Sequence, residues 1–73
     1  MKLDLTPTEF EVSAHLSSGY EAKEVARVMN KSYYTITTHK KSIFAKNDIK
    51  NVSELTMMFV LKYGDPRLLT KAS

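Results

Sequence analysis

The 73-residue chain contains no cysteine, which excludes disulfides, thiolate metal sites and a cysteine nucleophile. It has only two glycines, and neither belongs to a glycine-rich loop of the kind that binds phosphates. Its longest apolar run, Met57–Leu61, is far too short to span a membrane, and the N-terminal residues lack the apolar stretch of a signal peptide. We therefore expect a soluble, cytoplasmic protein without a membrane anchor.

Histidine is also scarce, and the two histidines, His15 and His39, suggest no catalytic or metal site. No carboxylate is spaced to complete a metal site or a catalytic triad with either of them, and the sequence shows no nucleophile–base pair. The sequence predicts a protein that is not an enzyme and that binds no metal and no cofactor.

Positive charge is concentrated in the middle of the chain. Residues 31–50 carry five lysines against a single aspartate, whereas residues 1–30 have more acidic than basic side chains. A localised basic segment is typical of a surface that binds nucleic-acid phosphates. An ordinary solvated helix face has the same composition, so charge alone leaves both interpretations open.

Capping signals predict four helices and no strand. Thr6 suits the N-cap of the first helix, with Pro7 at its first position and Glu9 at the reciprocal capping-box position. This helix should end at residues 17–19. The others are expected at about 22–29, 33–46 and from 51 to the Gly64-Asp65-Pro66 stop.

The second and third helices form the most informative pair. They are separated by a tight turn at residues 30–32, which ends in Ser32 as an N-cap. Ile36 and Ile43 should face the core, while the opposite face of the third helix is polar and basic. A short helix, a turn and a second helix with a basic face are typical of a helix-turn-helix. We expect an all-α, four-helix domain over residues 1–73, with an ordered core at about 4–64 and a tail at 65–73.

A series of residues extends this pattern over about Leu3–Leu61. In chain order they are Leu5-Thr6, Glu9, Glu11-Val12, Gly19, Lys23-Glu24-Val25-Ala26, Ser32, Thr35-Ile36, His39, Ile43, Lys46 and Ile49. With this spacing the chain resembles the LuxR/FixJ/GerE-type helix-turn-helix family. The resemblance implies a four-helix domain without a wing, in a bacterial transcription regulator that binds double-stranded DNA through the third helix in the major groove.

The resemblance also implies which residues contact DNA. Thr37, Thr38 and Lys41 correspond to the base-facing positions of the family. Lys46 and Lys23 are assigned to phosphates, although a structural role at the surface is an equal alternative for Lys23. Tyr34, Thr35 and Lys40 are further candidates; Thr35 has capping of the helix start as its alternative role, and Lys40 lies nearer the core. For His39, packing between the helices and contact with a phosphate remain two open alternatives.

Several residues depart from the family pattern. Ser13 replaces a leucine, Asn47-Asp48 replaces Leu-Gly, and Thr37 and Val52 stand where the family often has lysine and arginine. The loss of two basic side chains indicates weaker DNA contacts or reliance on a partner.

The fourth helix is the usual dimer contact of the family. Val52, Leu55, Met58 and Phe59 are predicted as an interface for a homodimer or heterodimer, although a purely core role is the simpler interpretation of Leu55–Leu61. The competing hypothesis for the whole chain is a helical protein-interaction module that binds RNA polymerase or another regulator and touches DNA only weakly.

Overall fold

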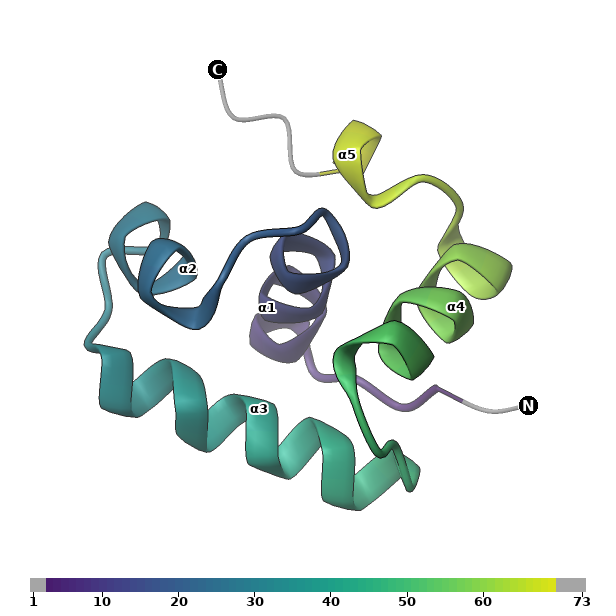
Figure 1. Cartoon of the computed structure of the whole chain (residues 1–73), viewed down its shortest axis with the longest axis horizontal. Helices are drawn as coiled ribbons and strands as arrows, with labels where there is room; N and C mark the ends of the chain where they lie inside the picture. Colours follow the sequence, from purple (N-terminus) through teal and green to yellow (C-terminus); the bar gives the residue numbers. More distant parts are fainter. Residues whose placement is uncertain (1–2, 70–73) are drawn as a thin grey trace.

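A computed structural model describes residues 3–69, which form five helices and no strand (Figure 1). The helices are α1 (Pro7–Ser17), α2 (Ala22–Val28), α3 (Tyr33–Asn47), α4 (Val52–Tyr63) and α5 (Pro66–Leu69). The predicted all-α helix-turn-helix class is confirmed. No helix within the described range is long and apolar enough to cross a membrane.

The C-terminal segment differs from the predicted tail. Residues 66–69 form the short helix α5, which packs against α1 and α4 and buries Pro66. A proline at the first position of a helix loses no hydrogen bond, so the residue expected to stop α4 also starts α5. The rest of the predicted tail, residues 70–73, lies outside the described residues.

The predicted caps fix the ends of the main helices. Thr6 and Glu9 form a reciprocal capping box: the Glu9 amide donates to Thr6 Oγ1 over 3.2 Å, and the Thr6 amide donates to Glu9 Oε1 over 3.0 Å. Ser32 accepts from the Thr35 amide at the start of α3, and Asn51 accepts from the Glu54 amide at the start of α4. Each cap satisfies an amide that would otherwise lack a partner.

Helix α1 lies at the centre of the molecule, with α3 below it and α4 beside it in Figure 1. Val12 and Leu16 of α1 are buried against Ile36 and Ile43 of α3 and Leu55 and Phe59 of α4 in one cluster. Phe10 adds an aromatic contact, with its ring 5.3 Å from that of Phe59. This single core sets the direction in which α3 presents its outer side.

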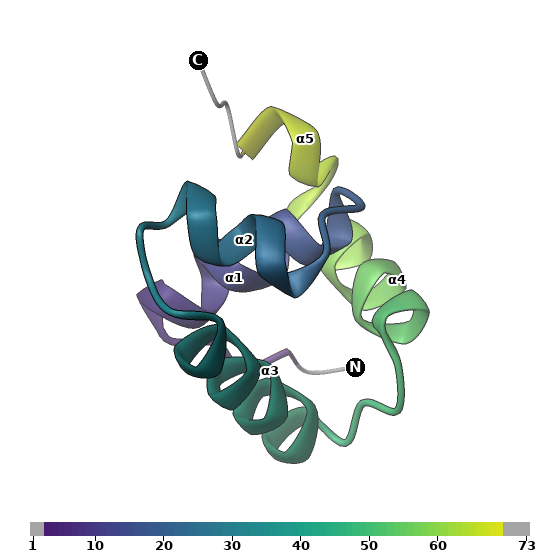
Figure 2. The same cartoon turned by 60° about the vertical axis from the view of Figure 1, so that its left-hand side comes forward.

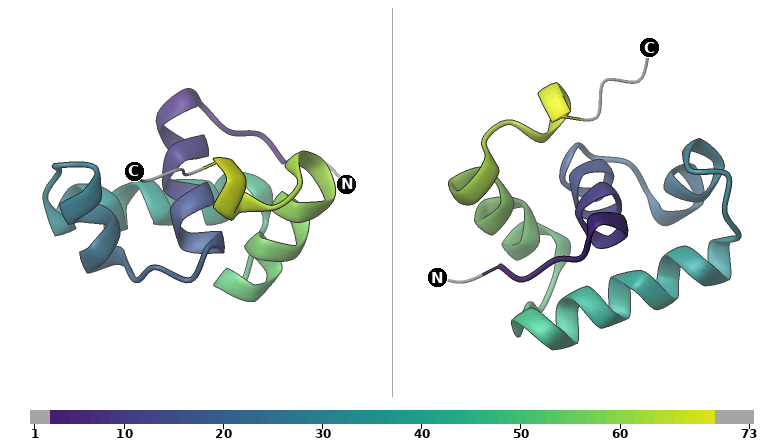
Figure 3. Two further views of the ribbon diagram at one scale, coloured as in Figure 1. Left: turned by 90° about the horizontal axis from the view of Figure 1, so that it is seen from above. Right: turned by 180° about the vertical axis from the view of Figure 1, so that it is seen from behind.

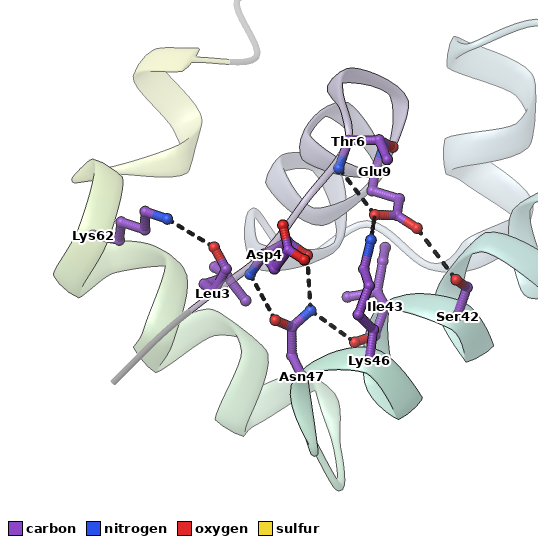
Figure 4. A network of polar contacts seen from close by, with 9 residues as sticks. All are labelled: Leu3, Asp4, Thr6, Glu9, Ser42, Ile43, Lys46, Asn47 and Lys62. Atoms are coloured by element: carbon purple, nitrogen blue, oxygen red, sulfur yellow. Dashed lines mark hydrogen bonds and ion pairs between the residues drawn. The ribbon is translucent and has the colours of Figure 1, made fainter.

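The N-terminal segment ties α3 to α4 (Figure 4). The Asn47 side chain accepts from the Asp4 amide over 2.6 Å and donates to the Asp4 carbonyl over 3.1 Å. Lys62 of α4 donates to the Leu3 carbonyl over 2.7 Å, and the Leu3 side chain is buried. Residues 3 and 4 therefore connect the C-terminal end of α3 with the C-terminal half of α4.

Candidate nucleic-acid interface

The turn between α2 and α3 has the tight geometry predicted for residues 30–32. Asn30 takes a left-handed conformation with φ 57°, and the Lys31 amide donates to the Ala26 carbonyl over 2.8 Å. Asparagine adopts this conformation more readily than most residues with a side chain. The turn places α2 and α3 in contact through the buried Val25, Ala26 and Ile36.

One side of α3 faces away from the rest of the protein. We call the four exposed residues on this side, Tyr34, Thr38, Lys41 and Ala45, the recognition face. They recur at three- and four-residue spacing, and Ile36 and Ile43 on the opposite side are fully buried. In Figures 1, 2 and 3 no other helix covers the outer side of α3, so this face is open to a ligand as large as a DNA duplex.

The three threonines near the start of α3 differ in their hydrogen bonds. Thr35 Oγ1 pairs with Ser32 Oγ over 2.9 Å, so its hydroxyl belongs to the helix cap. Thr37 Oγ1 donates to the Tyr34 carbonyl over 2.9 Å, and the side chain is half-buried at the edge of the recognition face. The Thr38 hydroxyl has no hydrogen-bond partner within residues 3–69, which leaves it available to a ligand.

Lys46 is not part of the recognition face, and its side chain is paired with Glu9 of α1 (Figure 4). Its Nζ is 2.5 Å from Glu9 Oε1, and Ser42 donates to Glu9 Oε2 over 3.3 Å. Glu9 is only 5% exposed. Burial raises the pKa of the Glu9 carboxyl, but the hydrogen bonds from Lys46, Thr6 and Ser42 together bring the pKa below its ordinary value. The negative charge is thus maintained inside the fold and holds the ammonium group.

The remaining cations around α3 carry no ion pair within the described part of the chain. Lys41 lies on the recognition face, and Lys40 lies at its inner edge with its ammonium group 5.7 Å from the centre of the Phe44 ring. Lys23 is exposed at the start of α2.

Three further exposed cations, which were not predicted from the sequence, lie on α2 or next to the two ends of α3: Arg27, Lys31 and Lys50. Their position in the chain beside the predicted recognition helix could have identified them.

The two histidines have different surroundings. His39 is half-buried on α3, and its imidazole has no hydrogen bond within residues 3–69, so neither of its two predicted roles is decided. His15 is 8% exposed and stacks on Tyr20 with ring centres 5.7 Å apart. Burial lowers the pKa of His15 against a smaller opposing effect of Glu11. Among the described residues, no group of three or more histidine, aspartate or glutamate side chains could hold a metal ion.

The apolar surface of α4 differs from the predicted interface. Leu55 and Phe59 are fully buried within the protein and Met58 is 9% exposed, while Val52 is half-buried. Leu55, Met58 and Phe59 are corrected to core residues, because α1 packs against this side of α4. The exposed apolar side chains of α4 are different ones: Met57 (52% exposed), Val60 (44%) and Leu61 (72%), which we call the α4 stripe.

Comparison with known proteins agrees with this geometry. Neither a search of curated proteins nor a search of solved structures found a match. Residues 3–59, well over half of the chain and all of α1, α2 and α3, match the family described as bacterial regulatory proteins, luxR family. The chain therefore belongs to the luxR family of bacterial regulatory proteins, a family of helix-turn-helix DNA-binding domains.

Proposed function

We propose that this domain controls transcription in the bacterial cytoplasm by placing α3 in the major groove of double-stranded DNA. The observation that carries the proposal is the recognition face, whose exposed side chains include the ammonium group of Lys41, which forms no ion pair in the described part of the chain. The major groove is about 12 Å wide, close to the diameter of a helix with its side chains. An uncovered helix with a polar and basic outer side fits this groove.

Phosphate contacts are assigned to cations that form no ion pair within residues 3–69. Lys23, Lys31, Lys40 and Lys50 meet this condition, and Lys31 and Lys50 lie next to the two ends of α3. Tyr34, which is 77% exposed, adds a hydroxyl at the start of the recognition face. Lys46 is not included, because moving its ammonium group to a phosphate would leave the buried Glu9 carboxylate without its cation.

The α4 stripe is proposed as the contact between two copies of the domain. Met57 and Leu61 are four residues apart and lie on one side of α4, with Val60 beside them. Association of two such stripes would remove apolar surface from water and place two recognition faces on a DNA site with two-fold symmetry. The same stripe supports the second candidate function, a contact with RNA polymerase or another regulator.

Binding to random-sequence duplex DNA at several salt concentrations tests the proposal. We compare the wild type with Lys41→Gln and with Arg67→Gln, which removes one positive charge from α5, far from α3 in Figure 1. Each phosphate contact contributes about 0.9 to the slope of log affinity against log salt. Steep salt dependence, weakened binding by Lys41→Gln and unchanged binding by Arg67→Gln are expected. Absence of binding at low salt would reject DNA binding and favour the protein-interaction module.

A further inference from the structure

The recognition face lacks the side chains that read bases through paired hydrogen bonds. It contains no arginine, asparagine or glutamine, and Lys41 is its only charged group. Arginine on guanine and asparagine or glutamine on adenine are the bidentate pairs that give most direct discrimination in the major groove. Sequence preference on this face must therefore come from other contacts.

Two of the other residues on the recognition face carry methyl groups. Thr38 and Ala45 are exposed and seven residues apart, so they lie on nearly the same line along α3 with Lys41 between them. Thr37 adds a methyl group at the edge, since its hydroxyl hydrogen is already donated to the Tyr34 carbonyl. The 5-methyl group of thymine is the apolar feature that the major groove offers to such side chains.

The surface beside these methyl groups is hollowed. A hollow of about 580 Å³ lies along α3 and is lined by Thr37, Lys41, Phe44 and Ala45, with Ile49 at its end. Phe44 is half-buried and Ile49 is buried, so these two side chains form an apolar wall that the core holds in place, while Lys40, Lys41 and Asp48 add charged groups to the lining. An apolar group of a base edge can enter this hollow while the ammonium group of Lys41 reaches a neighbouring base.

We infer that the recognition face reads thymine methyl groups, with Thr38 and Ala45 contacting thymines on either side of a guanine contacted by Lys41. This inference rests on the proposed function and names the base pattern that it would select. Seven residues of helix rise about 10.5 Å, which matches about three base-pair steps of 3.4 Å. The expected half-site therefore contains two thymines separated by a few base pairs, on either strand, with a guanine between them.

Uracil substitution tests the inference, because it removes only the 5-methyl group. Sites are selected from a random duplex library with the wild-type protein, and the enriched duplexes are resynthesised with uracil at single thymine positions. Loss of one contacted methyl group is expected to weaken binding about fourfold, the effect of one methyl group left exposed. A random duplex with all thymines replaced is the control and should bind as before.

Two matched variants assign the contact to a residue. Thr38→Ser removes the methyl group and keeps the hydroxyl, so it should become insensitive to uracil at one position. Thr38→Val keeps a methyl group and should retain the sensitivity; Thr38 is exposed, so neither change disturbs the core.

The outcomes separate this inference from the proposed function. Selected sites that lack thymine, or that bind equally with uracil, would overturn the inference while leaving DNA binding intact. Failure to bind any duplex at low salt would overturn both.

Discussion

Asp48 closes α3 in a conformation that residues with a side chain adopt at a cost. Its φ is 55° and its ψ 46°, and the turn lets the Ile49 amide donate to the Phe44 carbonyl over 2.8 Å. Glycine is the common residue at this position of a helix end because it has no Cβ to be strained. The exposed Asp48 also lines the hollow beside Lys41, where its carboxylate would face the DNA.

Two replacements of Asp48 distinguish the effect of its left-handed backbone on stability from the effect of its negative charge on DNA binding. Asp48→Gly is expected to be about 1 kcal/mol more stable than Asp48→Ala, because only alanine keeps a Cβ in the left-handed region. Both variants should bind duplex DNA more tightly than the wild type, since both remove a negative charge beside the recognition face. Urea unfolding and a DNA titration measure the two effects. Equal stabilities of the two variants would contradict the conformational explanation.

Ser13 is a second residue that is expected to lower the stability of the fold. It is fully buried in α1, and its Oγ has no hydrogen-bond partner among the residues that the structure describes. A buried polar group without a partner costs about 1–3 kcal/mol, so Ser13→Ala should raise the free energy of unfolding by about 1–2 kcal/mol. Ser53→Ala, at an exposed position of α4, controls for the better helix propensity of alanine. A gain no larger than that of Ser53→Ala would show that the Ser13 hydroxyl is satisfied.

At the scale of the elements, the sequence predicted what is decided locally. The caps at Thr6, Ser32 and Asn51 were predictable because each signal lies within about four residues of its helix start. The contact between Glu9 and Lys46 was not predictable from the sequence, because 37 positions separate the two residues. Only the packing of α1 on α3 brings them together. Glu9 was predicted correctly as a capping residue, but its second contact, the ion pair with Lys46, was not predicted.

The Glu9–Lys46 pair predicts how two lysines of α3 differ. Lys46→Met should lower the free energy of unfolding by about 2 kcal/mol, between the values for surface and buried pairs, because it leaves the Glu9 carboxylate unpaired. The slope of log DNA affinity against log salt should stay the same for this variant, while Lys40→Gln, which removes an α3 lysine assigned to phosphate, should reduce it by about one. A reduced slope for Lys46→Met would show that Lys46 contacts phosphate after all.

The same pair predicts how stability depends on pH. The folded-state pKa of Glu9 is below its ordinary value of 4.5, so its contribution is complete above pH 4.5 and is lost as the pH falls through the folded-state pKa. Glu9→Gln should therefore show a flatter loss of stability in acid than the wild type. Thermal unfolding at pH 7 and at pH values below 4.5 provides the comparison, and parallel curves for the two proteins would contradict this assignment.

At the scale of the whole molecule, the two sides of α4 have different roles. The sequence showed an apolar helix but not which side α1 would cover, because leucine, methionine and valine occur all around it. Packing of Phe10, Phe59 and Tyr63, with ring centres 4.9–5.3 Å apart, decides the buried side. The α4 stripe remains on the surface, where it is available for association.

Two substitutions on α4 should affect different properties, one the stability of the fold and the other self-association. Leu55→Ala removes a fully buried side chain and should cost about 2–5 kcal/mol of stability. Leu61→Glu lies on the α4 stripe and should leave the fold intact while preventing self-association, which sedimentation equilibrium measures. Weaker binding to a two-fold DNA site is expected for Leu61→Glu alone. An unchanged oligomeric state would show that this stripe does not join two copies.

The most direct test of the account is an NMR titration of the ¹⁵N-labelled protein with duplex DNA at low salt. If α3 enters the major groove, the largest amide shifts will lie on the recognition face, at Tyr34, Thr38, Lys41 and Ala45, with smaller ones at Lys31 and Lys50. The chemical shifts of the α5 amides will not change. Shifts confined to the α4 stripe, or no shifts at all, would contradict the assignment of α3 as the DNA-binding helix.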